Sequence, residues 1–244
     1  MMILPNKKEA IHKAWLYRVL EAIADDAHLP SVLYFKGGTC ASMLGWLDRF
    51  SVDLDFDYGG DGMDIDRTRR ALERIWRNLG LTIKDSSKKG IQYFLKYEHV
   101  GRNTLKMDAS FPLFPSSAYQ PQRFVEIDRI LTCQTRETMV AHKLVALIDR
   151  FEKTGHIAGR DLYDIHYFLM NGYAYAGAVI EERRGIGVKK FLSDLLDFIN
   201  REVTETVITE DLSSLLPLER FSMMRKVLKR EVLRLIKDEI TRLE

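Results

Sequence analysis

The spacing of apolar positions predicts the first elements of the chain. Within residues 7–27 apolar side chains recur at intervals of three and four, the period of an amphipathic helix; they are Ile11, Trp15, Val19, Leu20 and Ile23. A short apolar run over residues 32–35 follows Pro30 and ends at a Gly-Gly turn, which predicts a buried strand. Thr39 is then expected to cap a short helix that extends to about residue 47.

A different pattern, strict alternation of polar and apolar residues, occupies residues 51–57 and predicts a strand with one buried face. Residues 64–79 follow as a basic amphipathic helix that Gly80 is placed to end. Strand-like stretches are found at 81–85, 90–98 and 103–110. A loop with three prolines extends to residue 121, and residues 123–133 are expected to add short strands.

From Arg136 onward the pattern is helical, with helices expected at 136–151, 160–171, 188–201 and 219–243. In the last of these one apolar stripe is formed by Phe221, Met224, Leu228, Val232, Leu235, Ile236 and Ile240. The sequence therefore predicts an α+β domain over residues 1–134 and a helical domain over residues 135–244.

Composition excludes several classes of protein. Of 244 residues, 46% are apolar and 30% are charged, which is typical of a soluble globular protein and not of a disordered or membrane protein. No run reaches the roughly 18–20 apolar residues of a membrane span, and no signal peptide is recognisable. Cys40 and Cys133 have no metal-ligand spacing and are expected to be reduced. We expect a cytoplasmic protein without a membrane partner.

The charge is unevenly distributed along the chain. There are 37 Lys and Arg against 35 Asp and Glu, a net charge of +2. Residues 48–64 contain six Asp and one Arg, whereas residues 66–97 contain nine basic and three acidic residues and residues 220–244 contain eight basic and four acidic ones. An acidic pocket beside basic surfaces fits a metal-dependent enzyme that acts on a polyanion, although solvated helix faces explain the basic stretches equally well.

Three carboxylates follow one another on the alternating strand. Asp53, Asp55 and Asp57 share one face, because successive side chains on a strand point to opposite sides. Like charges so close together repel unless a cation intervenes, and Mg²⁺ or Mn²⁺ bound by these oxygens and by substrate phosphates is the natural counter-ion. An edge strand with solvated acids remains the alternative. A calcium loop is disfavoured, because Tyr58 stands where that loop needs glycine.

The Gly-Gly turn upstream of this strand is a candidate phosphate site. Lys36, Gly37, Gly38 and Thr39 lie between an expected strand and a helix start, where backbone N–H groups and a hydroxyl can approach phosphate oxygens. Neither of the common glycine-rich phosphate loops, GxxxxGK[ST] and GxGxxG, occurs in the chain.

The turn and the acidic strand together resemble a known family. The segments Phe35-Lys36-Gly37-Gly38-Thr39 and Arg49-Phe50-Ser51-Val52-Asp53-Leu54-Asp55-Phe56 are similar to those of the AbiEii/AbiGii (MenT-like) toxin nucleotidyltransferases, within the polymerase-β-like nucleotidyltransferase superfamily. The resemblance implies a core of mixed sheet with flanking helices, followed by a helical C-terminal domain that contributes to the active-site cleft.

The resemblance also implies roles for residues downstream. Leu105-Lys106-Met107-Asp108 matches a strand on which Lys106 binds nucleotide and Asp108 is a third metal ligand or a base. Ala141-His142-Lys143 and Arg160-Asp161-Leu162-Tyr163-Asp164 resemble the last two motifs of the family. Lys143 would contact the triphosphate of the bound NTP, and Asp161 would be a base or a positioning group. Some of these charged residues could instead form salt bridges between helices.

The implied activity is Mg²⁺-dependent transfer of a nucleoside monophosphate from an NTP to an acceptor hydroxyl. The favoured acceptor is the 3′ end of tRNA, and the protein would be the toxin of a toxin–antitoxin or phage-defence (abortive infection) pair with a cognate antitoxin. Alternatives are nucleotidylation of a protein, a regulatory NTP-binding protein without transfer activity, and a structural protein with an incidental acidic strand. Tyr93, Phe94 and Tyr97 could stack on RNA bases, but core packing is the favoured interpretation.

Overall fold

The computed structural model describes residues 2–243 and divides the chain into two compact units. The α+β unit comprises the chain up to Trp46 together with Phe50–Thr135, and the helical unit comprises Leu47–Arg49 together with the chain from Arg136 onward. The change of pattern at the end of the strands was visible in the sequence. The three residues Leu47–Arg49, which belong to the helical unit, were not marked by any periodicity.

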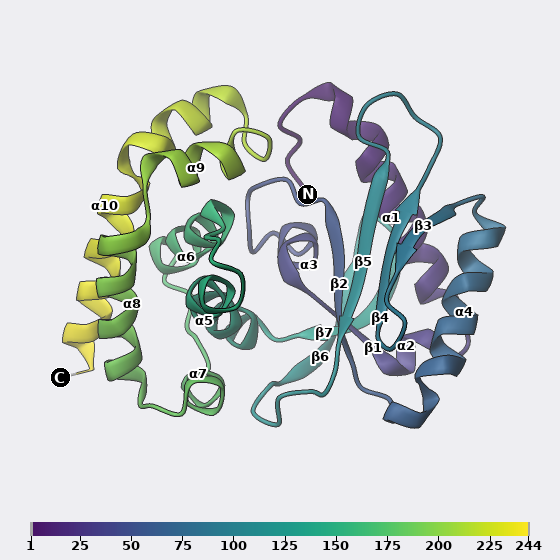
Figure 1. Ribbon diagram of the computed structural model, residues 1–244, viewed down its shortest axis with the longest axis horizontal. Coiled ribbons are helices and arrows are strands. Elements are labelled where there is room, and N and C mark those ends of the chain that lie inside the picture. Colours follow the sequence, from purple (N-terminus) through teal and green to yellow (C-terminus); the bar gives the residue numbers. More distant parts are fainter. Residues whose placement is uncertain (1, 244) are drawn as a thin grey trace. The chain divides into compact units, whose positions relative to one another are not determined.

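A seven-stranded mixed sheet forms the centre of the α+β unit, with the order β3-β4-β5-β2-β1-β7-β6 (Figure 1). The pairs β1/β7 and β2/β5 are parallel and the other neighbours are antiparallel. The strands are β1 (Leu33–Lys36), β2 (Asp53–Tyr58), β3 (Thr82–Ser86), β4 (Ile91–Lys96), β5 (Thr104–Ser110), β6 (Tyr119–Phe124) and β7 (Arg129–Gln134). The strand carrying the acids is therefore central, which excludes the expectation of an exposed edge strand.

Helices cover the sheet unequally. Figure 1 shows α1 (Ala10–Ala24), α2 (Leu29–Val32) and α4 (Ile65–Asn78) on one side of the sheet and α3 (Gly37–Met43) on the other. The apolar face of β2, formed by Leu54, Phe56 and Tyr58, is fully buried. Burial of the apolar face of this strand leaves its acidic side chains on the opposite face, as the alternation predicts.

Several boundaries in this unit differ from the sequence prediction. The strand β6 begins at Tyr119, inside the expected proline loop, because its residues pair with β7, and α1 ends at Ala24 rather than at residue 27. Lys36 is the N-cap of α3, so the helix begins at Gly37 and Thr39 lies inside it rather than capping it. A 3₁₀ turn, η1 (Lys7–Glu9), precedes α1. The side chain of Asn6 accepts a hydrogen bond from the backbone N–H of Lys8 and so caps this turn. The helix over 64–79 and its end at Gly80, with φ of +70°, are confirmed.

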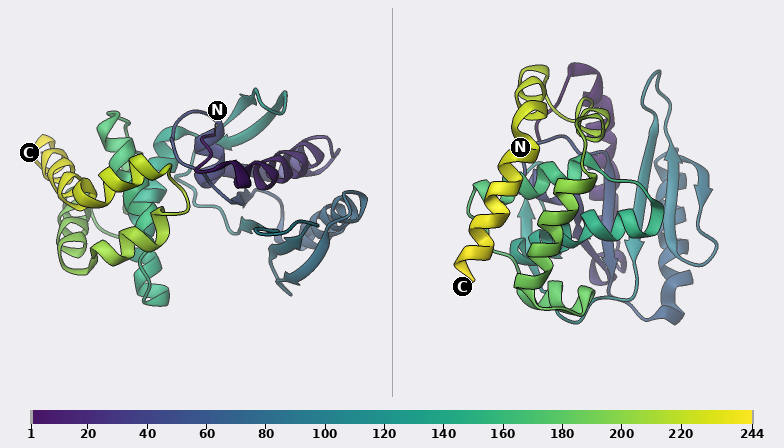
Figure 2. Two further views of the ribbon diagram at one scale, coloured as in Figure 1. Left: turned by 90° about the horizontal axis from the view of Figure 1, so that it is seen from above. Right: turned by 60° about the vertical axis from the view of Figure 1, so that its left-hand side comes forward.

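In the part of the helical unit that the structure describes, helices account for nearly all regular structure. They are α5 (Arg136–Thr154), α6 (Gly159–Met170), α7 (Gly177–Arg184), α8 (Val188–Glu202), α9 (Glu205–Leu212) and α10 (Leu218–Arg242). The short helices α7 and α9 were missed by the sequence pattern, since eight residues contain too few apolar repeats. Figures 1 and 2 both show α8 and α10 side by side.

Packing in this unit uses the predicted stripe of α10. Its positions Phe221, Met224, Leu228, Val232 and Ile236 are buried. At the start of α6 a side chain on Gly159 would place its Cβ 2.6 Å from the carbonyl oxygen of Val207, so only glycine allows α9 to approach this closely. An α+β sheet followed by a helical region is thus confirmed as the fold class.

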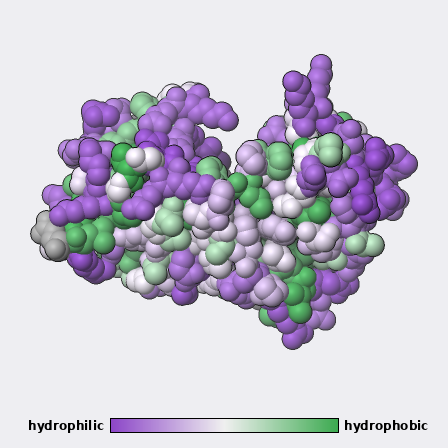
Figure 3. Space-filling view, turned by 90° about the horizontal axis from the view of Figure 1, so that it is seen from below, coloured by the Kyte–Doolittle hydropathy of each residue, from purple (hydrophilic) through white to green (hydrophobic). Residues whose placement is uncertain are grey.

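The surface gives little support to an apolar partner. On the face drawn in Figure 3 the hydrophobic residues form small separate patches among hydrophilic ones. No helix within residues 2–243 is long and apolar enough to cross a bilayer. Tyr93 and Tyr97 are buried in the core of the α+β unit, so the core interpretation of these two aromatic residues is confirmed.

Candidate active site

The acidic face of β2 gathers several of the residues singled out in the sequence. Asp53 pairs in register with Lys106 of β5, and Asp55 pairs with Asp108. On the other side Asp55 pairs with Lys36 of β1. Because residues directly opposite each other on neighbouring strands point to the same face, these five side chains share one surface of the sheet.

The third acid of the strand, Asp57, belongs to the fold. Its carboxylate is buried and accepts hydrogen bonds from Lys36 Nζ at 2.5 Å, the Tyr119 hydroxyl at 2.8 Å and Gln134 Nε2 at 2.6 Å. These donors come from β1, β6 and β7, so Asp57 ties three strands to β2. A buried carboxylate that is neutralised in this way has no need of a metal ion.

Asp55 has a different environment. Its carboxylate lies against the backbone of Gly37, where the Cβ of any other residue would be 2.6 Å from Asp55 Oδ2. Gly37 also has a φ of +78°, which side-chain-bearing residues rarely adopt. The first glycine of the Gly-Gly turn is therefore required twice, for its backbone conformation and for the close approach of a carboxylate.

Two other residues of the turn have partners within the protein. The buried hydroxyl of Thr39 donates to the backbone oxygen of Asp53 at 2.5 Å, which fixes α3 to the start of β2. Lys36 donates to Ser110 Oγ at 3.0 Å in addition to Asp57. In this conformation Thr39 and Lys36 hold the turn against the strands, and Gly38 lies buried in the first turn of α3.

The three-carboxylate set of Asp53, Asp55 and Asp108 is not assembled in the structure. Lys106 Nζ lies 3.3 Å from Asp108 Oδ2, so the carboxylate of Asp108 interacts with a lysine on its own strand. Among residues 2–243 no three His, Cys, Asp or Glu side chains converge closely enough to hold a metal ion. The physical reason is the repulsion between like charges. Carboxylates on paired strands either move apart or bind a cation, and the ammonium of Lys106 is the cation next to Asp108.

A two-carboxylate set does fit Mg²⁺ or Mn²⁺. These hard cations are commonly bound in nucleotide enzymes by one or two carboxylates, with the remaining ligands provided by water and substrate phosphates. Asp53 and Asp55 stand two residues apart on one face of a central strand, beside a glycine turn. Their oxygen chemistry and their place next to the turn match that requirement.

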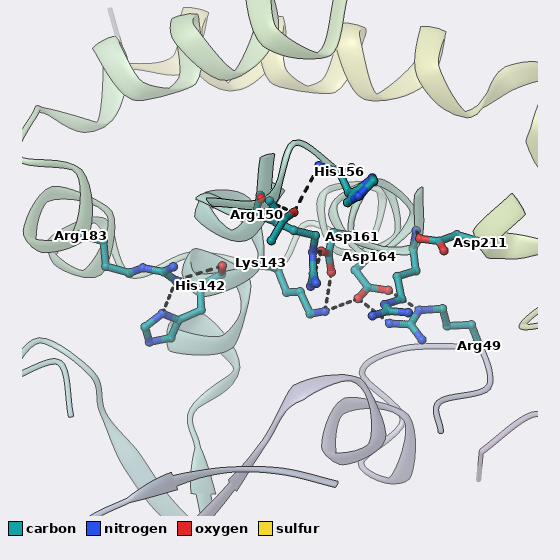
Figure 4. A network of polar contacts seen from close by, with 11 residues as sticks. Arg49, His142, Lys143, Arg150, His156, Asp161, Asp164, Arg183 and Asp211 are labelled. Carbon is teal, nitrogen blue, oxygen red and sulfur yellow. Dashed lines mark hydrogen bonds and ion pairs between the residues drawn. The ribbon is translucent and has the colours of Figure 1, made fainter. Parts of the chain in front are cut away.

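The second group of candidate residues lies within the helical unit (Figure 4). Lys143 of α5 extends between two carboxylates of α6, with Nζ 2.9 Å from Asp161 Oδ1 and 2.8 Å from Asp164 Oδ2. Arg49 holds Asp164 from the other side through two hydrogen bonds of 2.6 and 2.7 Å, and Arg150 lies 3.2 Å from Asp161 Oδ2. Both carboxylates are fully buried.

Burial and charge act in opposite directions on this network. Burial favours the protonated acid and so raises the pKa of Asp161, but the positive charges of Lys143, Arg150 and Arg160 outweigh it and bring the pKa down to about 2. Burial likewise lowers the pKa of Lys143, and attraction to Asp161 and Asp164 more than compensates, so that the pKa is raised. Asp161 and Lys143 are therefore both charged at neutral pH.

Three cations, Arg49, Lys143 and Arg150, meet two anions, Asp161 and Asp164, which leaves 3 − 2 = +1 net charge in the network. Sequence reasoning selected Lys143 and Asp161 but gave no role to the Arg49–Asp164 pair. The signal that could have found it is a charged residue flanked by apolar ones: Asp164 lies among Leu162, Tyr163 and Ile165, all of which are buried.

Comparisons with known proteins agree with this architecture. A family model described as the nucleotidyl transferase AbiEii toxin of type IV toxin–antitoxin systems matches residues 18–229. The crystal structure of JHP933 from Helicobacter pylori covers 99% of this chain and 98% of its own, with a TM-score of 0.54 and 20% identity. A candidate nucleotidyltransferase from H. pylori covers 98% of this chain and 99% of its own, with a TM-score of 0.56 and 20% identity. No curated protein sequence matches the chain significantly.

Proposed function

Because the chain belongs to the AbiEii family of nucleotidyltransferase toxins, we propose that it uses Mg²⁺ to transfer a nucleoside monophosphate from an NTP to a hydroxyl group of RNA, with the 3′ end of tRNA as the favoured acceptor. The observation that supports this most strongly is the close approach of the Asp55 carboxylate to the backbone of Gly37, on the face of β2 that also bears Asp53.

In this proposal Asp53 and Asp55 hold the metal ion, and the backbone of Gly37 and Gly38 faces the phosphates. Bound Mg²⁺ would neutralise charge on the triphosphate and polarise the α-phosphate. The acceptor hydroxyl oxygen forms the new bond to the α-phosphorus, while the bond from that phosphorus to the bridging oxygen breaks and pyrophosphate leaves. The chain's own contribution is to orient the nucleotide for this in-line displacement.

The proton of the acceptor hydroxyl needs a base, and we assign it to Asp108. Asp161 is a poor proton acceptor, because its pKa is about 2 and two cations hold it. Asp108 is about one-third exposed and pairs in register with Asp55. Of the two roles considered for Asp161, base or positioning group, the positioning role is then the proposed one. Lys106 holds the carboxylate of Asp108 in place.

Lys143 is proposed to act on the triphosphate. Its raised pKa keeps it cationic, and the +1 charge of its network favours an anion. Replacing Lys143 by Met should raise KM for NTP and lower kcat, and Lys143→Arg should recover part of both losses. A purely structural role would instead lower the folded fraction and leave KM of the folded protein unchanged.

The direct test is incubation of the pure protein with Mg²⁺, α-labelled NTPs and total cellular RNA. Label in RNA, absent with Asp55→Ala, is the expected result. Label in protein instead of RNA would select the protein-modifying alternative, and no label in either would contradict transfer. Expression of the wild type and Asp55→Ala in growing cells tests toxicity with the same pair of proteins; the family implies relief by a cognate antitoxin.

The alternative of a regulatory NTP-binding protein makes a different prediction. In that case Mg²⁺ and an NTP would raise the melting temperature without any turnover, and Asp55→Ala would leave toxicity unchanged. Loss of toxicity in Asp55→Ala together with retained NTP binding would favour catalysis.

A further inference from the structure

The exposed side of α10 has a row of cations that the proposed reaction does not use. Lys226, Arg230 and Arg234 follow one another at four-residue spacing and Lys237 follows at three, so they lie on one side of the helix. All four are exposed, and together with Lys229 and Leu233 they border an open hollow of about 400 Å³. We call Lys226, Arg230, Arg234 and Lys237 the α10 cation row.

These cations differ from others in the same unit. None of the four side chains forms an ion pair or hydrogen bond with another described residue. By contrast Arg183 and Arg184 bind Asp149, Arg201 binds Glu202, and Lys190 binds Asp194. Like charges at four-residue spacing on a helix repel one another, so the row weakens α10 unless an anion lies across it.

Lys229, next to the row, belongs to the fold. Its ammonium donates to the backbone oxygens of Asn200 at 3.0 Å and Val203 at 2.8 Å, at the C-terminal end of α8. This contact fixes α10 against α8. The positive charge of Lys229 is also stabilised by the negative, C-terminal end of the α8 dipole. The row is thereby presented on a helix whose position in the unit is anchored beside it.

We propose that the α10 cation row is a docking surface for the phosphate backbone of RNA. From Lys226 to Lys237 the helix rises about 16 Å at about 1.5 Å per residue. Four cations spread over this length can meet several successive phosphates of one RNA strand. Such contacts position RNA without reading its sequence.

Two other polyanions fit less well. A membrane-surface helix needs a broad apolar face beside its cations, and the apolar stripe of α10 is instead buried within the helical unit. An acidic protein would also be attracted, but nothing on the row other than Leu233 and the neighbouring Met223 offers the apolar contacts of a protein interface. The choice of RNA rests on the proposed function, which supplies an RNA acceptor.

The test compares two triple variants of the full chain, which remove the same number of positive charges from different places. Arg230→Ala/Arg234→Ala/Lys237→Ala removes two arginines and one lysine from the row. The control Arg201→Ala/Arg242→Ala/Lys190→Ala removes the same residue types from exposed positions that are paired with acids. Binding of fluorescein-labelled total tRNA is measured without NTP over a range of salt concentrations.

We expect the slope of log K against log salt to become shallower by about two in the row variant and to stay close to the wild type in the control. Equal slopes in the row variant and the control would overturn the proposal. So would displacement of tRNA by phosphatidylserine vesicles or by polyglutamate as efficiently as by unlabelled tRNA at equal charge.

Failure of the docking surface and failure of the proposed reaction can be distinguished. The binding assay contains no NTP, and Asp55→Asn should bind tRNA as the wild type does. If the row variant binds tRNA more weakly but the wild type transfers no label, the docking surface is supported and the proposed transfer reaction is contradicted. Normal transfer at limiting tRNA by the row variant would keep the reaction and reject the surface.

Discussion

At the scale of single residues, the environment of each carboxylate on β2 assigns its task. Asp57 is surrounded by three donors that make it part of the fold, whereas Asp55 lies against a glycine backbone at the end of the turn. The same amino acid at alternate positions of one strand thus has a structural role and a proposed catalytic one. Two glycines allow the environment of Asp55 to be tested, and one histidine tests the burial of a neighbouring group.

Gly37→Ala should damage the turn more than the same change at Gly45. Both glycines have positive φ, +78° and +72°, so alanine is strained at both by about 1–2 kcal/mol. Only at Gly37 would the new Cβ meet Asp55, because nothing lies within 4 Å of a Cβ at Gly45. We expect Gly45→Ala to lose stability alone and Gly37→Ala to lose transfer activity as well. Urea denaturation and labelling assays on both variants check this, and equal activity would contradict it.

His12 should make stability fall as the pH is lowered. Its Nε2 donates to the Val52 carbonyl oxygen at 2.8 Å, and burial holds its pKa below the usual 6.5. Below about pH 6.5 the unfolded chain therefore binds a proton that the folded chain resists, so stability is lost from there downward, by at most about 1.4 kcal/mol per pH unit.

The measurement for His12 is urea denaturation of the wild type and His12→Gln at pH 7.5, 6.5 and 5.5. The variant should be less stable at pH 7.5, but its stability should depend less on pH than that of the wild type. Identical pH dependence in both proteins would show that His12 titrates normally in the folded state.

At the scale of elements, the central strands and the long helices follow from local pattern, whereas β6 and the short helices do not. Alternation located β2, and apolar spacing located α4, α5, α8 and α10. The helix α2 could not be found, since four residues beginning next to Pro30 have no periodicity. Thr39 was misassigned as a cap because its hydroxyl bonds to Asp53, fourteen residues away, and such long-range contacts leave no mark on local sequence.

The buried contacts between α5, α6 and Arg49 were also beyond local pattern, and they should dominate the stability of the helical unit. Removing one partner of a buried ion pair leaves an uncompensated charge, at a cost of about 3–5 kcal/mol. Arg49→Met should therefore destabilise strongly, since Arg49 and Asp164 are almost fully buried. Arg123→Ala, which breaks an exposed pair with Asp128, should change stability far less.

A double substitution separates charge from packing in this prediction. Adding Asp164→Leu to Arg49→Met should cost less than the sum of the single changes, because the unpaired charge is removed. Chemical denaturation of the four proteins gives the coupling energy. An additive result would mean that Arg49 and Asp164 do not interact in solution.

At the scale of the whole molecule, the small net charge of +2 results from cancellation. The acidic stretch contains the paired carboxylates of the sheet, and one of the basic stretches contains the α10 cation row. The family and the fold class could be predicted from sequence, whereas the candidate site residues stay predictions. Which carboxylates are structural could not be predicted, because that depends on which strands and helices bring hydrogen-bond donors to Asp57 and Asp164.

The chain passes between its two units more than once. Leu47–Arg49 belongs to the helical unit, although Phe50 and the strand after it return to the α+β unit. The domain bounds read from the sequence, 1–134 and 135–244, stay a prediction. Because the chain crosses between the units in this way, variants should be studied in the full chain.

The central claim is that Asp55 performs chemistry while Asp57 maintains the fold, and the rate of label transfer by Asp55→Asn and Asp57→Asn tests it most directly. Both changes remove one negative charge and keep the side-chain shape. At equal folded fraction, Asp55→Asn should lower kcat by about 1,000-fold or more without loss of stability, consistent with loss of about 4 kcal/mol of transition-state stabilisation. Asp57→Asn should lower stability and leave kcat within about tenfold. The reverse order of effects would contradict the account.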